Sequence, residues 1–211
     1  MNATLSHANE FLLALQTHAG RYGVQFDDRE GARLRDYYEQ VNLWNARLHL
    51  VAPCSPEEFA TRHVLESLCA VPHLTKGARV ADVGSGAGLP ALPCLIVRPD
   101  LRATLIEASA KKTIFLRETL RRVAPEAAAV VINQRFEASP APVADVLTCR
   151  ALDRFTEKFN ELVAWSPPTA TLLFFGGHAL RERIEGAGLS FKALRLPESE
   201  QRFLFIVKRE G

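Results

Sequence analysis

The sequence has few cysteines and no long apolar run. Its four cysteines lie far apart and none forms a Cys-x-x-Cys pair, which excludes a disulfide framework or a zinc knuckle, so we predict no metal site. No segment approaches the roughly eighteen apolar residues that cross a bilayer. The first twenty residues lack a basic leader and a small-residue cleavage site. We therefore expect a cytoplasmic protein with reduced thiols and no membrane association.

A strong charge of one sign is also missing. The 211 residues carry a formal net charge of +2, with 7 Lys/Arg against 9 Asp/Glu in residues 1–76 and 19 against 15 in residues 77–211. The basic excess of the second part is too small to establish nucleic-acid binding by itself. Because 47% of the residues are hydrophobic, the chain can bury a sizeable core, which favours one principal domain with a smaller attachment.

The spacing of apolar residues divides the chain at residue 76. Residues 1–76 predict a helical extension, with helical spacing over 5–19 and 29–48 and a capping box at Ser55-Pro56-Glu57-Glu58 that begins a third helix. Residues 77–211 alternate strand-like with helical runs, which predicts an α/β domain with a mostly parallel sheet covered on both faces. We expect the two parts to form one compact unit.

The expected strands are 79–83, 102–107, 129–133, 144–149, 170–175, 189–196 and 202–208. The last two are separated only by a short polar link, which predicts an antiparallel hairpin at the edge of the sheet. The expected helices of this part lie near 90–98, 110–123, 154–165 and 179–186.

The stretch ADVGSGAGLPALP (81–93) places Gly84, Gly86 and Gly88 between an expected strand and an expected helix. A nucleotide-type ligand can contact the backbone at such a turn. Asp82 precedes the loop, and Glu107 ends the next strand, 19 residues beyond Gly88, where a carboxylate can accept both hydroxyls of a ribose. A tight turn that binds nothing is the alternative.

Two nucleotide classes fit a glycine loop of this kind. Gly86-Ala-Gly88-Leu-Pro-Ala91 formally satisfies the dinucleotide pattern, but a nearby Asp82 is unfavourable for a pyrophosphate, and Pro90 and Pro93 offer no amide to it. S-adenosylmethionine has no phosphate and carries two cationic groups, for which a carboxylate is favourable. The pattern therefore favours a methyl donor over a nicotinamide.

Seven stretches, in order, resemble the RsmG (GidB) family, the small-subunit ribosomal RNA methyltransferases G. They are NLWNARLHLVAP (42–53), RHVLESL (62–68), DVGSGAGLPALPCLIVRPDL (82–101), KKTIFLRETL (111–120), QRFEA (134–138), CRALDRF (149–155) and RFLFIVK (202–208). The chain departs from the family pattern at Arg47–Leu50, at Ala91, and at Gly176-Gly177, where the family usually has Lys-Gly.

The resemblance implies a class I S-adenosylmethionine-dependent methyltransferase with a Rossmann-like fold. It also implies transfer of a methyl group to N7 of a guanine in 16S rRNA, with 16S rRNA or the small ribosomal subunit as partner and a monomer as the expected state. By motif, it assigns cofactor contacts to Gly84, Leu89, Phe136, Glu137 and Arg150, in addition to Asp82, Gly86, Gly88 and Glu107 of the loop pattern.

Several of these side chains also have a purely structural interpretation. Phe136 can be a core aromatic, and Arg150 can form an ion pair with Glu137 or Asp145. His63 is interpreted as a packing or capping residue, Trp44 and Asn45 as helix packing, and Cys149 as a buried strand residue. The basic side chains of helix 110–123 either contact RNA phosphates or only face solvent: Lys111, Arg117, Arg121 and Arg122.

No general base is required for this chemistry, because N7 of neutral guanine carries a lone pair and no proton. Catalysis then consists mainly of positioning. No catalytic residue is identified, and Arg150 is the candidate for positioning. Three other functions remain open. The first is a methyltransferase-like protein that binds S-adenosylmethionine and acts on another RNA. The others are a nicotinamide-dependent oxidoreductase, for which the three tyrosines offer no suitable acid, and a non-catalytic RNA-binding or ribosome-assembly module.

Overall fold

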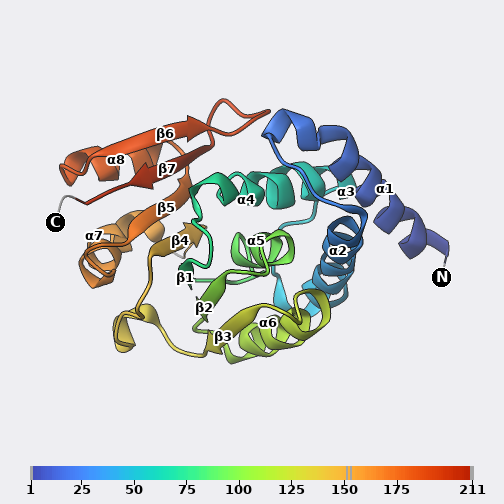
Figure 1. Cartoon of the computed structure of the whole chain (residues 1–211), viewed down its shortest axis with the longest axis horizontal. Coiled ribbons are helices and arrows are strands. Elements are labelled where there is room, and N and C mark those ends of the chain that lie inside the picture. The colour runs from blue at the N-terminus through green and yellow to red at the C-terminus, as the bar shows by residue number, and fades with distance from the viewer. Residues whose placement is uncertain (1, 151, 153, 210–211) are drawn as a thin grey trace.

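A seven-stranded sheet forms the centre of the molecule in the computed structural model, which describes residues 2–150, 152 and 154–209 (Figure 1). The strand order is β3-β2-β1-β4-β5-β7-β6. The first five strands are mutually parallel, whereas β7 is antiparallel to both β5 and β6. The strands are β1 (Arg79–Val83), β2 (Arg102–Ile106), β3 (Ala128–Ile132), β4 (Val146–Arg150), β5 (Thr171–Gly176), β6 (Phe191–Arg195) and β7 (Phe203–Val207).

Helices cover both faces of the sheet. They are α1 (Asn2–His18), α2 (Asp28–Leu48), α3 (Pro56–Glu58), α4 (Glu66–Leu68), α5 (Ala91–Val97), α6 (Ala110–Val123), α7 (Phe155–Trp165) and α8 (His178–Gly186). Short 3₁₀ turns lie at Ala19–Tyr22, Val71–His73 and Phe136–Ala138, and a π-helical stretch, η2 (Phe59–Leu65), lies between α3 and α4. No helix within the described residues is long and apolar enough to cross a membrane.

The two faces of the sheet contribute to two hydrophobic clusters because neighbouring side chains of a strand point to opposite sides. Leu173 and Phe175 of β5 belong to a large cluster that also includes residues of α1, α2, η2, α5 and α6. Leu172 and Phe174 belong to a smaller cluster with α7 and α8. The large cluster extends without interruption from the first helices into the sheet, so residues on both sides of position 76 share one core.

The observed elements agree closely with the sequence prediction. Each expected strand is present within two residues of its predicted ends, and the final hairpin lies at the sheet edge as predicted. One detail was wrong: the expected capping box at Ser55 is only half formed. Ser55 Oγ accepts a hydrogen bond from Glu58 N, but the Glu58 carboxylate binds Arg62, one helical turn further on.

Candidate functional site

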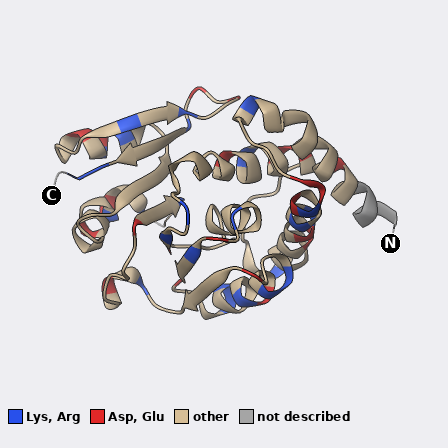
Figure 2. Ribbon diagram, in the orientation of Figure 1, with Lys and Arg blue, Asp and Glu red and all other residues tan. Residues whose placement is uncertain are grey.

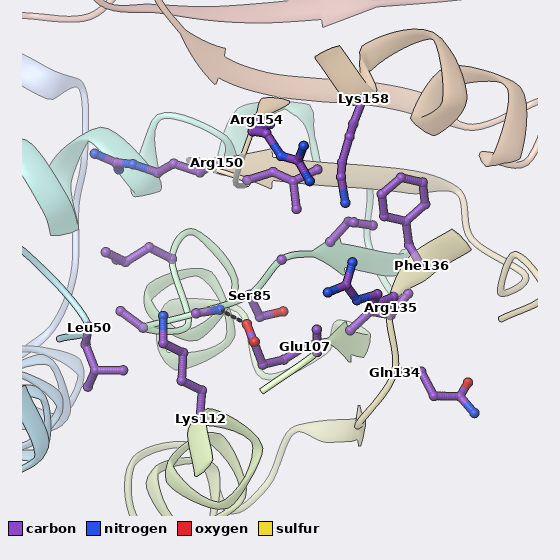
Figure 3. Close-up of a pocket in the computed structure, with 18 of the residues that line it drawn as sticks. Leu50, Ser85, Glu107, Lys112, Gln134, Arg135, Phe136, Arg150, Arg154 and Lys158 are labelled. Carbon is purple, nitrogen blue, oxygen red and sulfur yellow. Dashed lines mark hydrogen bonds between the residues drawn. The ribbon is translucent and has the colours of Figure 1, made fainter. Parts of the chain in front are cut away.

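A cavity of about 490 Å³ opens at the carboxyl ends of β1, β2 and β4 (Figure 3). The strand order reverses between β1 and β4, and open α/β sheets bind ligands at such a switch point. Seven of the nine predicted cofactor residues line this cavity, and Asp82 and Gly88 do not. The seven are Gly84, Gly86, Leu89, Glu107, Phe136, Glu137 and Arg150.

The three glycines of the loop have different roles. All have positive φ, but a Cβ on Gly88 would lie 2.3 Å from Leu92 Cδ1, and one on Gly84 would lie 2.7 Å from Leu152 Cδ1. Gly84 and Gly88 therefore allow the loop to pack closely against Leu152 and Leu92 of the same chain. A Cβ on Gly86 would meet only the Gly84 carbonyl, at 3.6 Å, so Gly86 is the glycine whose missing side chain leaves space at the cavity.

Glu107 lies directly after β2 and holds the loop in place. Its Oε2 accepts a hydrogen bond from Gly86 N at 2.9 Å (dashed in Figure 3), and its Oε1 accepts one from Ser109 N at 2.7 Å. A carboxylate has about four acceptor positions, so each oxygen keeps one for a ligand hydroxyl. The predicted ribose-binding residue therefore has a second role, as a brace for the glycine loop.

Asp82 lies beneath the loop and is fully buried. Thr148 Oγ1 donates to Asp82 Oδ1 at 2.7 Å, while Asp82 Oδ2 has no hydrogen-bond partner among the described residues. Burial raises the pKa of this carboxyl to about 7. Since the side chain does not line the cavity, its influence on a bound ligand acts through the loop and not through contact.

Tyr37 fixes the other side of the loop from the N-terminal part of the chain. This fully buried residue of α2 donates from its hydroxyl to the Ala87 carbonyl at 2.9 Å. Ala87 lies between Gly86 and Gly88 and lines the cavity. The helical extension thus contributes directly to the shape of the site, a contact that no motif in the sequence indicated.

Arg150 ends β4, but its guanidinium is occupied by the N-terminal part of the chain. It donates to the Arg62 carbonyl at 2.6 Å, to Ser67 Oγ at 3.1 Å and to Glu66 Oε2 at 3.1 Å. In Figure 3 the side chain extends to the side opposite Phe136 and Lys158. The predicted ion pair of Arg150 with Glu137 or Asp145 is wrong.

The two acidic partners suggested for Arg150 pair with other residues. Asp145 binds Arg79, and Glu137 binds Lys158. Phe136 is buried and packs edge-on against Trp165, with the centroids of the two rings 5.5 Å apart. Phe136 is therefore a core aromatic that also lines the cavity.

Four basic side chains around the cavity were not identified from the sequence: Lys112, Arg135, Arg154 and Lys158 (Figure 3). The first three lie within the quoted stretches KKTIFLRETL, QRFEA and CRALDRF, so the stretches that pointed to the family contained them. Ala151 and Asp153 of the last stretch lie outside the described residues. No motif in the sequence pointed to Lys158, because it lies one turn inside α7, an ordinary amphipathic helix.

The basic residues predicted for RNA contact lie along α6, where Figure 2 shows Lys and Arg gathered. Lys111, Arg121 and Arg122 are exposed. Arg117 is exposed as well, but its Nη2 donates to the Val131 carbonyl of β3 at 2.9 Å, which ties its guanidinium to the sheet. Gly176 and Gly177 do not line the cavity.

The order of strands, with a final antiparallel hairpin, and the glycine loop after β1 define a Rossmann-like fold of the class I methyltransferase type. A solved structure with this fold is magnesium protoporphyrin IX methyltransferase from Synechocystis PCC 6803. It is similar with a TM-score of 0.61 at 15% identity, over 88% of this chain and 99% of that one. At this identity the likeness establishes the fold.

The sequence identifies the particular family. A family model described as rRNA small subunit methyltransferase G matches residues 30–203. The chain is 40% identical over 163 residues to the ribosomal RNA small subunit methyltransferase G of Xanthomonas campestris pv. campestris (strain B100), and 38% identical to that of Xanthomonas axonopodis pv. citri (strain 306). Both alignments cover 77% of this chain and 69% of the relative. The chain belongs to this methyltransferase family, which confirms the resemblance found in the sequence.

Proposed function

We propose that the protein transfers the methyl group of S-adenosylmethionine to N7 of a guanine in 16S rRNA, in the cytoplasm and as a monomer. The observation that carries the proposal is the family match over residues 30–203, which includes the whole rim of the cavity. The relatives' names specify ribosomal RNA of the small subunit. The basic side chains around the cavity and along α6 support a polyanionic partner.

The residues of the cavity fit S-adenosylmethionine. Glu107 has acceptor positions left for the two ribose hydroxyls, and Gly86 gives the ligand access to the backbone. Leu89 and Phe136 supply apolar surface. Asp82 and Gly88 belong to this site as residues that shape the loop.

When bound, the cofactor supplies an electrophilic methyl group on a positively charged sulfur. The N7 lone pair of guanine would take up this methyl group, the sulfur would leave as a neutral thioether, and the positive charge would pass to the base. Because no proton is removed, the residues of the chain need only position the two reactants and exclude water. The loop braced by Glu107 and Tyr37 performs this role on the cofactor side.

The proposal is tested with a tritiated methyl donor and three acceptors: 16S rRNA, small subunits and tRNA. We expect incorporation into 16S rRNA, free or assembled. Methylation at N7 weakens the glycosidic bond, so borohydride followed by aniline should cut the product at one new guanine. Incorporation into tRNA alone would contradict the substrate. Cofactor binding without transfer to any of the three would favour an RNA-binding or assembly module.

A further inference from the structure

The helix from Pro56 to Leu68 has an irregular centre that faces the cavity. The π-helical stretch η2 covers seven residues of it, Phe59–Leu65. Such wide turns are rare and frequently mark functional sites, because they displace a side chain from its regular position. His63 is the residue of this stretch that lines the cavity.

A buried charge network holds the irregular turn in place. Arg150 donates to the carbonyls of Arg62 and His63, at 2.6 and 3.3 Å, within η2. Glu66, which is 1% exposed, accepts from Arg150 through Oε2 at 3.1 Å and from Arg202 through Oε1 at 2.7 Å. The guanidinium of Arg150 therefore fixes the backbone of His63.

The imidazole of His63 has no hydrogen bond to any described residue. Its ring packs against Phe59, with centroids 5.2 Å apart. Burial and the positive charges of Arg150, Arg62 and Arg202 lower its pKa to about 4, despite the opposing effect of Glu58, so the ring is neutral at physiological pH. A neutral imidazole offers one N–H donor and one acceptor, and both are available here.

His63 lies where the methyl end of a cofactor held by Glu107 would lie. Glu107 follows β2 and Phe136 follows β3, so these residues would hold the ribose and its base on the β2–β3 side of the switch point. The side of the cavity next to β4 is formed by Arg150 and Leu152, and His63 lies there because its carbonyl accepts a hydrogen bond from Arg150. The methyl group would then meet the acceptor base on that side.

We propose that His63 contacts the acceptor base, with its ring N–H donating to an oxygen next to the attacking nitrogen, and that Arg150, Glu66 and Arg202 are positioning residues for it. The inference rests on the proposed function. On a guanine, N7 and O6 are neighbouring acceptors, so a donor to O6 leaves the N7 lone pair free to attack. A neutral donor also avoids repulsion of the positively charged product base.

The test compares His63→Ala, His63→Gln and His63→Phe with the exposed control His7→Ala. Methyl transfer to 16S rRNA, or to small subunits if these are the better acceptor, is measured with saturating cofactor, and cofactor affinity by calorimetry. We expect His63→Ala and His63→Phe to lower kcat/KM for RNA by roughly 10- to 100-fold, the effect of one lost hydrogen bond in an enclosed site. Gln, which retains a donor, should recover part of the loss, and all three variants should keep cofactor affinity within about twofold.

Several outcomes would overturn the inference. Wild-type rates in His63→Ala would show that the imidazole does not contact the acceptor, and full activity of His63→Phe would show that the ring only packs. Loss of cofactor affinity in His63→Gln would assign His63 to the cofactor end. If the wild type binds the cofactor but methylates no RNA, the proposed function itself fails. If the wild type is active and the His63 variants are equally active, only the role of His63 fails.

Discussion

Replacing Glu107 by Ala should destabilise the protein even without a ligand. The change removes two acceptors, for Gly86 N at 2.9 Å and Ser109 N at 2.7 Å. Hydrogen bonds to a charged group contribute about 1.5–3 kcal/mol each, and water entering from the cavity replaces part of this. We therefore expect the free energy of unfolding to fall by about 2–4 kcal/mol. Glu107→Gln keeps one oxygen but places its amide group against a backbone donor, so its free energy of unfolding should lie between those of the wild type and Glu107→Ala.

Cofactor affinity should fall in the same variant by about 10- to 150-fold, which corresponds to roughly 1.5–3 kcal/mol for charge-assisted hydrogen bonds to the ribose. Urea unfolding without ligand and calorimetric titration with S-adenosylhomocysteine separate the two effects. Glu118→Ala, on the exposed side of α6, is the matched control and should change neither quantity by more than about 0.5 kcal/mol. An unchanged urea midpoint in Glu107→Ala would refute the bracing role, and unchanged affinity would refute the ribose contact.

Three further predictions concern the loop, the pH dependence and the RNA. Tyr37→Phe leaves the Ala87 carbonyl without its donor, so we expect a loss of stability of about 1–3 kcal/mol and weaker cofactor binding by calorimetry; affinity equal to that of the wild type would contradict a role in shaping the site. The raised pKa of Asp82, about 7, means that this residue contributes to the free energy of unfolding at low pH and loses that contribution as pH rises from about 4 to 7. The lowered pKa of His63, about 4, has the opposite effect, because the contribution of His63 to the free energy of unfolding is lost as pH falls from 6.5 to 4. In urea titrations, Asp82→Asn should therefore lose stability more steeply than the wild type on acidification over this range, and His63→Gln should gain relative to it; parallel curves for all three proteins would show that the two shifts are absent. The third prediction concerns three exposed basic residues of α6, Lys111, Arg121 and Arg122. Replacing all three by Gln should flatten the slope of log RNA affinity against log salt by about 0.7–0.9 for each lost phosphate contact, and it should leave cofactor affinity unchanged. An unchanged slope would show that the RNA does not contact α6.

The fold could be predicted from the sequence because its signals are local. The apolar runs of the strands, the glycine loop and the alternation with helices each depend on neighbouring residues, and all agree with one architecture. The position of Glu107 at the cavity followed from the same logic, since residues after neighbouring parallel strands meet at one edge.

The contacts that complete the site depend on residues distant in sequence. The sequence suggested Glu137 or Asp145 as the ion-pair partner of Arg150, but its actual partners, Glu66 and the π-helical turn, lie more than eighty positions before it. Tyr37 reaches Ala87 across 50 positions, and no spacing rule relates them. The pairing of donors and acceptors so far apart in the sequence depends on how the helical extension packs on the sheet. That packing is a property of the whole core.

The position of β7 between β5 and β6 also orders the events of folding. β6 is made before β7, yet it borders the sheet only through β7, so it cannot join until the later strand has paired with β5. Arg202, directly before β7, is brought to Glu66 by the same step. The last strand of the chain therefore also brings the second of the two arginines that pair with Glu66, and the turn carrying His63 acquires its full support only when β7 is in the sheet.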